Sequence, residues 1–173
     1  MSVIPIVKIP AQVLSTKCDT IREITPDVKR IAKDLLDTFR HPDTHGVGLA
    51  APQLGHSLAM CAVVRHIKDH KPQEFLLINP KITKSSTATD ITWEGCLSIP
   101  DLYCRVQRSK SIAVEYIDLE GKPQKIKATG FFARVIQHEF DHLQGVLITD
   151  KCIGKKKKKK GLDEYLAKEK GND

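Results

Sequence analysis

The sequence has no long hydrophobic run, and its longest uninterrupted apolar segment is the seven residues from Leu58 to Val64. A membrane-spanning helix needs about 20 such residues, so we expect no membrane segment. The N-terminus also lacks the charged stretch followed by a long apolar stretch that marks a secretory signal. These absences predict a cytoplasmic protein, although a mature organelle protein that has lost its transit peptide would have the same features.

Cysteine is scarce, odd in number and irregularly spaced. The chain has five, with no CxxC pair: Cys18, Cys61, Cys96, Cys104 and Cys152. A disulfide framework normally uses an even number of cysteines in a small secreted chain. We therefore expect reduced thiols, and any of them that has a function would bind a metal or take part in chemistry.

The body of the chain has almost no excess charge. The net charge is +7, from 28 basic and 21 acidic residues, but six lysines are consecutive, Lys155 to Lys160. Without that run, 22 basic residues face 21 acidic ones, so no basic face predicts binding to DNA. The run should repel itself and stay loose. We therefore predict one domain over residues 1–153, followed by a lysine-rich, flexible tail over 154–173.

Apolar residues recur with helical spacing in two segments. In the first, Thr25 and Pro26 suit the start of a helix, and His41–Pro42 ends the pattern. In the second, Gly130 precedes the periodic residues, and Gly145 suits the position just after a helix end. The spacing predicts one helix between Pro26 and His41 and another between Gly130 and Gly145.

Strand patterns lie mainly between these two helices. The segments with such patterns are residues 58–64, 74–78, 111–118 and 124–128. The sequence LEGK joins the last two as a hairpin signal, and residues 45–55 have the composition of a loop rich in small residues. Because strands cluster between helices rather than alternate with them, we predict an α+β fold with antiparallel strands.

The second helix carries the sequence QHEFDHLQG, residues 137–145. Two histidines four residues apart, His138 and His142, lie on one face of a helix. Glu139 directly follows the first, which completes the HExxH pattern of two metal ligands and a carboxylate that handles a water proton. A catalytic site of this kind needs a third protein ligand and an open position.

The third ligand is not obvious from the helix. In metzincins it is a histidine six residues after the second one, but Ile148 occupies that place. In gluzincins it is a later glutamate, and only Glu164 and Glu169 remain downstream, behind the lysine run. Upstream candidates include Cys96, whose thiolate would make a soft site for Fe²⁺, Zn²⁺, Co²⁺ or Ni²⁺ together with two imidazoles.

Three motifs together resemble the signatures of peptide deformylases: GVGLAAPQLG at 46–55, EGCLSIP at 94–100 and QHEFDHLQG at 137–145. Their order and spacing match, and the resemblance covers about residues 3 to 150. It implies a compact single domain around a central HExxH helix. It also implies a bacterial-type cytoplasmic enzyme that removes the formyl group from the N-terminal formyl-methionine of newly made polypeptides, releasing formate.

The resemblance also implies roles for particular residues. The metal ligands fall on Cys96, His138 and His142. The catalytic group falls on Glu139, and the oxyanion donors fall on the Gln53 carboxamide and the backbone N–H of Leu97. Substrate-binding positions fall on Val47 and Gly48, and the helix spacing adds Val135 as a candidate wall of the methionine slot. Fe²⁺ is the expected native metal, with Zn²⁺, Ni²⁺ or Co²⁺ as alternatives.

Some features depart from the family pattern or leave alternatives open. The family pairs the glutamate of the middle motif, Glu94, with a later arginine, for which Arg108 and Arg105 both qualify. Tyr103 lies where some bacterial relatives carry an arginine that faces the substrate. The lysine tail could contact ribosomal RNA phosphates. The alternative function is that of another HExxH-type metallopeptidase.

Overall fold

The computed structural model describes residues 3–67 and 69–158, and its two α-helices are α1 (Pro26–Arg40) and α2 (Gly130–Leu143). Short 3-10 turns are η1 (Gln12–Ser15) and η2 (Ala51–Leu54). The strands are β1 (Gly48–Ala50), β2 (Met60–Arg65), β3 (Gln73–Ser85), β4 (Thr89–Cys96), β5 (Ile99–Ser109), β6 (Ser111–Ile117), β7 (Pro123–Thr129) and β8 (Ile153–Lys158).

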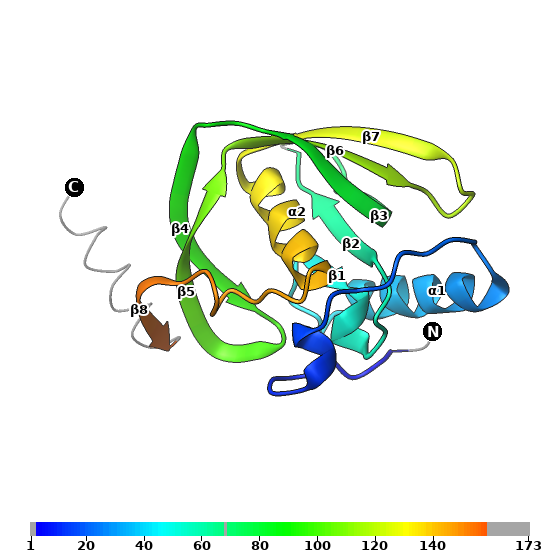
Figure 1. The fold of residues 1–173 in the computed structure, drawn as a ribbon, viewed down its shortest axis with the longest axis horizontal. Coiled ribbons are helices and arrows are strands. Elements are labelled where there is room, and N and C mark those ends of the chain that lie inside the picture. Colours follow the sequence, from blue (N-terminus) through cyan, green and yellow to red (C-terminus); the bar gives the residue numbers. More distant parts are fainter. Residues whose placement is uncertain (1–2, 68, 159–173) are drawn as a thin grey trace.

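The strands form two antiparallel sheets, as Figure 1 shows. One has five strands in the order β1-β2-β3-β6-β7, and the other has three in the order β4-β5-β8. Helix α2 contacts strands of both sheets, whereas α1 contacts β1 and β2 of the larger one. The predicted α+β class with antiparallel strands is therefore confirmed. Among the described residues, no helix is long and apolar enough to cross a membrane.

Both predicted helices are present, with the predicted ends. The Thr25 hydroxyl accepts a hydrogen bond from the backbone N–H of Val28 at 3.3 Å, and Pro26 opens α1. At the end of α2, Gly145 takes a left-handed backbone with φ +71°, which favours glycine. A side chain at Gly145 would also meet the backbone of Ser15 at 2.8 Å. The position just after α2 therefore requires glycine, because the backbone at the end of η1 packs directly against it.

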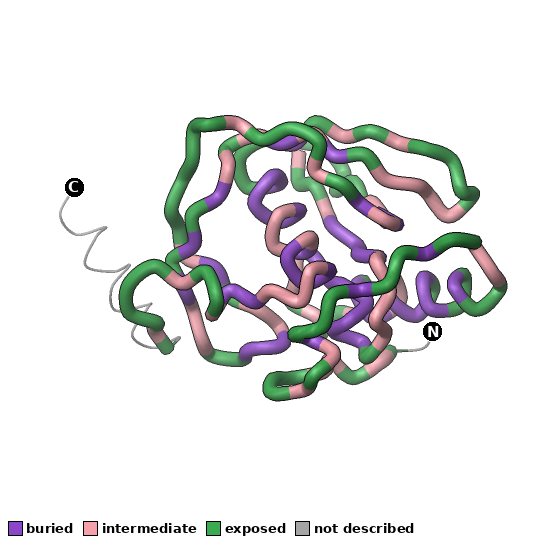
Figure 2. Tube along the Cα trace, viewed as in Figure 1, coloured by how far each residue is buried: buried purple, intermediate pink, exposed green. Residues whose placement is uncertain are grey.

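Buried side chains form three hydrophobic clusters around these elements. One lies between α2 and the five-stranded sheet, and a second lies under α1. The third joins β5 to the segment that follows α2, through residues such as Val106 and Ile148. Figure 2 shows the buried stretches on both helices. Because α2 is packed on more than one side, polar groups on it are withdrawn from water.

The strand predictions were incomplete. The four predicted segments correspond to β2, β3, β6 and β7. The β4–β5 hairpin was missed, although it holds the middle motif, and β1 lies inside the segment predicted as a loop. In β5 the residues at Cys104, Val106 and Arg108 alternate inward. Because one of these inward positions is an arginine, β5 does not show the apolar alternation from which a strand is predicted.

The chain also differs from the prediction where the lysine run begins. Residues Ile153–Lys158 form β8, which pairs with β5 through Tyr103 and Lys157 among others. The ammonium of Lys157 lies 5.4 Å from the centre of the Trp93 ring, a favourable cation–π contact. Backbone pairing with an otherwise open strand edge thus offsets lysine repulsion. The rest of the predicted tail, 159–173, lies outside the described residues.

Candidate active site

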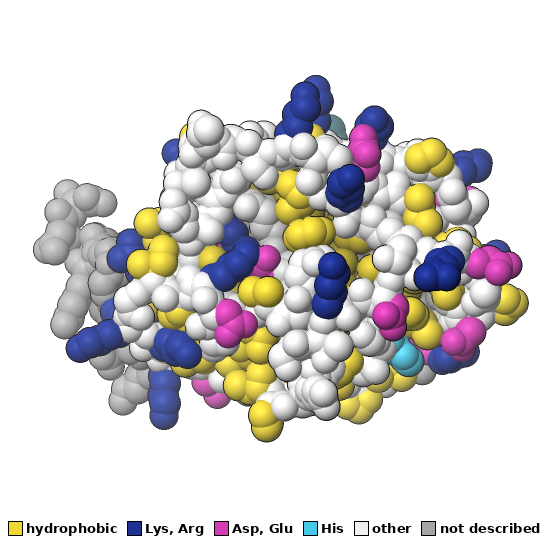
Figure 3. All heavy atoms as spheres, viewed as in Figure 1, with side chains coloured by type: hydrophobic (Ala, Val, Ile, Leu, Met, Phe, Trp, Pro, Cys, Tyr) yellow, Lys and Arg dark blue, Asp and Glu magenta, His cyan; other side chains and the backbone are white. Residues whose placement is uncertain are grey.

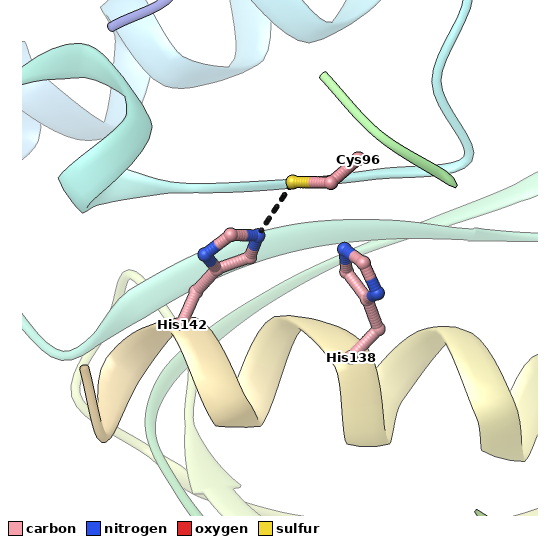
Figure 4. Close-up of side chains that lie close together, drawn as sticks. All are labelled: Cys96, His138 and His142. Atoms are coloured by element: carbon pink, nitrogen blue, oxygen red, sulfur yellow. Dashed lines mark hydrogen bonds between the residues drawn. The ribbon is translucent and has the colours of Figure 1, made fainter. Parts of the chain in front are cut away.

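Cys96, His138 and His142 come together at the heart of the site. Cys96 ends β4, and the two histidines stand one turn apart on α2. One potential ligand atom from each lies within 4.8 Å of the others. The Cys96 Sγ is 3.3 Å from Nε2 of His142, and Figure 4 shows the side chains converging. One thiolate and two imidazoles form a donor set that suits Fe²⁺, Zn²⁺, Co²⁺ or Ni²⁺.

A tight hairpin presents Cys96 to the helix. Gly95 pairs with Tyr103, but Cys96 pairs with Ile99, so the register shifts between these neighbours. A side chain at Gly95 would lie 2.8 Å from the Tyr103 ring, so the close approach of that ring requires glycine. The irregularity turns the end of β4 so that its thiol faces α2.

Glu94 contacts the side of the His138 ring that faces away from the other two ligands. Its Oε2 lies 3.0 Å from Nδ1 of His138, which leaves Nε2 for a metal. Arg108 donates to both Glu94 oxygens, each at 2.9 Å. Burial raises the pKa of Glu94, but the hydrogen bonds from Arg108 and His138 outweigh burial and hold it well below its ordinary value. Of the two arginines left open by the sequence, Arg108 is therefore the partner.

Three further residues that were not predicted from the sequence join this network: Arg134 and Asp141, which are buried, and Lys151, which is exposed. Arg134 donates to Glu94 at 2.7 Å. Arg108 also donates to Asp141, which lies inside the HExxH motif, and Lys151 donates to Asp141 at 2.6 Å. Arg134 precedes His138 by four residues, so helical spacing could have indicated it. Asp141 and Lys151 carry no such signal, because their partners come from elsewhere in the chain.

Glu139 is buried beside the ligands, with 3% of its surface exposed. Its Oε2 has no hydrogen-bond partner among the described residues, and burial raises the pKa of this carboxyl to about 7. A side chain at Gly48 would come within 2.3 Å of Glu139 Oε1. Gly48 is thus required for space, and the carboxyl can exchange a proton near neutral pH.

Gln53 has a fixed orientation next to the thiol. Its Oε1 accepts a hydrogen bond from the Ala50 N–H at 2.9 Å, so its amide nitrogen must point the other way. That Nε2 donates to the Ser98 hydroxyl at 3.2 Å and lies 3.9 Å from Cys96 Sγ. Leu97 follows Cys96, and its carbonyl accepts from Lys8 at 2.6 Å. Gln53 and Leu97 therefore both lie next to Cys96, and both line the same pocket.

The two imidazoles are in opposite electrostatic environments. Burial lowers the pKa of His138, but hydrogen bonds with Cys96 and Glu94 outweigh burial and raise it to about 10. Burial, followed by the nearby charge of His138, lowers the pKa of His142 to about 3. The chain alone therefore holds a proton on His138. Metal binding requires a thiolate and neutral imidazoles, so a divalent cation would take the place of that proton.

A pocket of about 470 Å³ opens onto this group. It is lined by eight of the nine residues predicted for the site: Val47, Gly48, Gln53, Cys96, Leu97, Val135, His138 and Glu139. The ninth, His142, lies beneath the pocket and is 2% exposed. Glu164 and Glu169, the alternative ligands, lie outside the described residues. A pocket of this size fits a short peptide segment or one extended side chain.

Comparison with known proteins identifies one family. A family model described as polypeptide deformylase matches residues 3–159. The peptide deformylase of Rhizobium meliloti is 40% identical over 150 residues, which cover 87% of this chain and 85% of the relative. The crystal structure of the Thermotoga maritima peptide deformylase is 32% identical, with a TM-score of 0.79, and the match covers 89% of this chain and 100% of that one.

A second solved structure is informative because of its ligand. It is a class I type b peptide deformylase from Acinetobacter baumannii with Met-Ala-Ser bound. It is 29% identical, with a TM-score of 0.79, and the match covers 87% of this chain and 99% of that one. The family model spans most of the chain. The curated relative and the two solved structures each align with most of this chain and with most of their own length. The chain therefore belongs to the polypeptide deformylase family.

Proposed function

We propose that this enzyme removes the formyl group from the N-terminal formyl-methionine of newly made polypeptides and releases formate in a metal-dependent reaction. The observation that carries the proposal is the convergence of Cys96, His138 and His142 beside the buried carboxyl of Glu139. Three protein donors leave a coordination position open, as catalytic sites of this type require.

The metal would be held by the Cys96 thiolate and the two imidazoles. We propose Fe²⁺ as the native ion, which the family resemblance and thiolate ligation favour. Zn²⁺, Ni²⁺ or Co²⁺ would also bind, because affinity for nitrogen and sulfur ligands generally rises from Fe²⁺ onward. A metal ion held by these residues would supply Lewis-acid chemistry, because it would polarise a carbonyl and lower the pKa of water.

The chain's own residues account for the proton transfers and the developing charge. Glu139 takes a proton from water as the water oxygen bonds to the formyl carbon. The carbonyl oxygen becomes negative, and Gln53 Nε2 and the Leu97 N–H donate hydrogen bonds to it. When the carbon–nitrogen bond breaks, Glu139 gives its proton to the departing amine. The products are formate and a free N-terminal methionine. Water supplies the new oxygen of formate and the proton that the amine receives.

The pocket supports a substrate that begins with methionine. Val47 and Val135 line the pocket and provide apolar surface for a thioether side chain. Gly48 lines the pocket beside them, and its lack of a side chain leaves room for Glu139. A relative binds Met-Ala-Ser, which is formyl-Met-Ala-Ser without its formyl group. We therefore assign Val47, Gly48 and Val135 to substrate binding.

The decisive experiment compares two peptides. Metal-loaded enzyme should release formate from formyl-Met-Ala-Ser and should leave an unformylated, internally cleavable peptide intact. Cys96→Ser should lose both bound metal and formate release, while Cys104→Ser, on the neighbouring strand, should retain both. Cleavage of the unformylated peptide would favour the alternative of another HExxH-type metallopeptidase. Full metal content and full activity in Cys96→Ser would overturn the ligand assignment.

We also propose that the enzyme meets its nascent substrates at ribosomes in the cytoplasm, through the lysines of β8. Lys155, Lys156 and Lys158 are exposed, and Figure 3 shows basic side chains gathered at the left, beside the end of the described chain. Such a strip suits the phosphates of RNA, and its binding should weaken with salt.

Charge removal tests this better than truncation, because truncation after Ile153 would remove a paired strand. Lys155, Lys156 and Lys158 should be changed together to glutamine, with Lys157 kept in place over Trp93. Co-sedimentation with ribosomes should fall at low salt, and the difference should shrink at high salt. Formate release from the short peptide should stay within about twofold of wild type, because these residues do not line the pocket. Unchanged co-sedimentation at low salt would refute the proposal.

A further inference from the structure

Arg134 is a buried charge that the proposed chemistry does not use. It is 6% exposed and lies on α2, where it lines the pocket wall. One guanidinium nitrogen donates to Glu94 Oε1 at 2.7 Å and to the Val106 carbonyl at 2.9 Å. The other donates to the Asp90 carbonyl at 3.0 Å. Arg134 therefore ties α2 to both β4 and β5.

Charge balance does not by itself explain where this arginine lies. The buried carboxylates of the network are Glu94 and Asp141, and the buried cations are Arg108 and Arg134, while the Lys151 side chain, which also pairs with Asp141, is 42% exposed. The other carboxylate near Arg134 is that of Asp90, which is 3.5 Å away and has a mostly exposed side chain. Burying a cation costs free energy unless its partners compensate for the lost hydration, and the partners of Arg134 are fixed in place: Glu94 and two backbone carbonyls. The role of Arg134 therefore lies in where it holds Glu94 as well as in its charge.

The hydrogen bonds around Glu94 show what is held. Oε1 accepts from Arg108 and Arg134, and Oε2 accepts from Arg108 and lies against Nδ1 of His138. A carboxylate has about four lone-pair sites, so this one is filled. Arg108 is itself held by Asp141, but a single planar pair still leaves Glu94 free to tilt against it. Arg134 adds a second anchor on Glu94 Oε1, and two backbone carbonyls fix the position of Arg134.

We propose that Arg134 is a positioning residue that, one helical turn before His138, locks Glu94 so that Nε2 of His138 points at the metal. Arg134 and His138 are four residues apart on α2, and they grip different oxygens of the same carboxylate. The set of residues that supports the metal site therefore begins with Arg134, one helical turn before the HExxH sequence. This inference rests on the proposed metal site, and it concerns the hold on the ligand rather than the reaction itself.

The test is cobalt binding to metal-free protein. Co²⁺ is titrated into wild type and Arg134→Gln, with visible absorption reporting ligand geometry and a chelator setting the affinity scale. Loss of an outer partner of a ligating histidine typically weakens metal affinity 10–100-fold. We expect about 10-fold weaker binding and an altered spectrum for Arg134→Gln, since Arg134 acts through Glu94. Arg134→Lys should fall in between, because one ammonium cannot reach all three acceptors.

Two control variants separate positioning from stability. Asp90→Asn alters the exposed neighbour of Arg134, and Ile136→Val trims a buried α2 residue outside the ligand network. Both should bind Co²⁺ within about twofold of wild type. Circular dichroism of the metal-free proteins reports folding, and if Arg134→Gln does not fold, Arg134→Lys decides.

The outcomes are distinct. Wild-type affinity and spectrum in the folded arginine variants would overturn the inference while leaving the proposed function intact. An equal loss of affinity in Ile136→Val would overturn it as well, because destabilisation alone would then account for the effect. Wild-type protein that binds no Co²⁺ would overturn the proposed metal site itself.

Discussion

Helices α1 and α2 place their charged side chains in opposite ways. On α1, most charged residues face solvent and pair along the helix, as Arg30 does with Asp27 and Lys33 with Asp37, and the buried Asp34 also pairs with Arg30. Its buried face is mainly apolar, with Leu35 fully covered. On α2, the buried residues include Arg134, Glu139, Asp141 and His142.

This difference separates a helix that stabilises the fold from one that serves the site. Exposed ion pairs contribute little to stability, because water screens them and their side chains lose freedom on pairing. Buried charges cost several kcal/mol each unless partners compensate for the lost hydration. Almost every charge on α2 has such partners, and Glu139, whose Oε2 has none, is the group proposed to move protons. Substitutions on the two helices should therefore have different consequences.

The largest effect is expected at Glu139. Glu139→Gln keeps the size of the side chain but cannot carry a proton between water and amine. Turnover should fall by roughly 10²–10⁴-fold, the usual share of acid–base catalysis. Metal content, measured by atomic absorption, should match wild type, because the proposed ligands are unchanged. Loss of metal together with activity would show that Glu139 acts as a ligand.

Glu94→Gln should cause the next largest effect, on stability. Without the Glu94 charge, Arg108 keeps only Asp141 and Arg134 keeps only the exposed Asp90, and losses of this kind from a buried ion pair are about 3–5 kcal/mol. Urea unfolding of metal-free protein at pH 7 measures the change. An equally stable variant would mean that the network is not coupled to folding.

The pH dependence of stability tests the contribution of the ionised Glu94 carboxylate in a second way. Its pKa in the folded protein is held below the ordinary 4.5, so the ionised form stabilises the fold above that pH. This stabilisation is lost as pH falls below 4.5 toward the folded-state pKa. Glu94→Gln should lack this component, so the stability gap between variant and wild type should narrow in acid.

A change on the buried face of α1 should affect stability alone. Leu35→Ala removes a fully buried side chain, and such truncations cost about 2–5 kcal/mol. Thermal unfolding should show the loss. Turnover and metal affinity, measured well below the unfolding temperature, should stay near wild type. A drop in either would reveal coupling between α1 and the site.

The smallest effect is expected on the exposed face of α1. Lys33→Gln removes the ion pair with Asp37, in which the lysine side chain is 65% exposed. Neither the unfolding midpoint nor formate release should change measurably in physiological salt. A clear destabilisation would contradict the view that charges on α1 are solvated.

The sequence also predicted the features of α1 more completely than those of α2. For α1, the Thr25 cap, the leading Pro26 and the apolar spacing are all local signals, and the structure has each of them. For α2, the motif and Gly145 located the helix, but nothing local indicated Asp141 as the partner of Arg108. Charges buried on a helix weaken the apolar pattern from which burial is predicted.

The hairpin β4–β5 and strand β8 were missed for related reasons. Glu94 and Arg108 occupy buried strand positions that a sequence pattern assigns to apolar residues. In β8, a run of lysines predicts repulsion, while pairing with β5 and the contact of Lys157 with Trp93 hold it in place. Each error arose where an interaction with a distant strand outweighed the preference of the local sequence.

What the residues alone establish is local: a helix with His138 and His142 on one face, ended by Gly145. That follows from a repeat of 3.6 residues per turn, which operates over a few neighbours. Only folding brings Cys96 to within 3.3 Å of His142, across 46 positions, and stacks Arg134 and His138 on one carboxylate. Such contacts depend on how the two sheets pack around α2, because burial and register are properties of the whole chain.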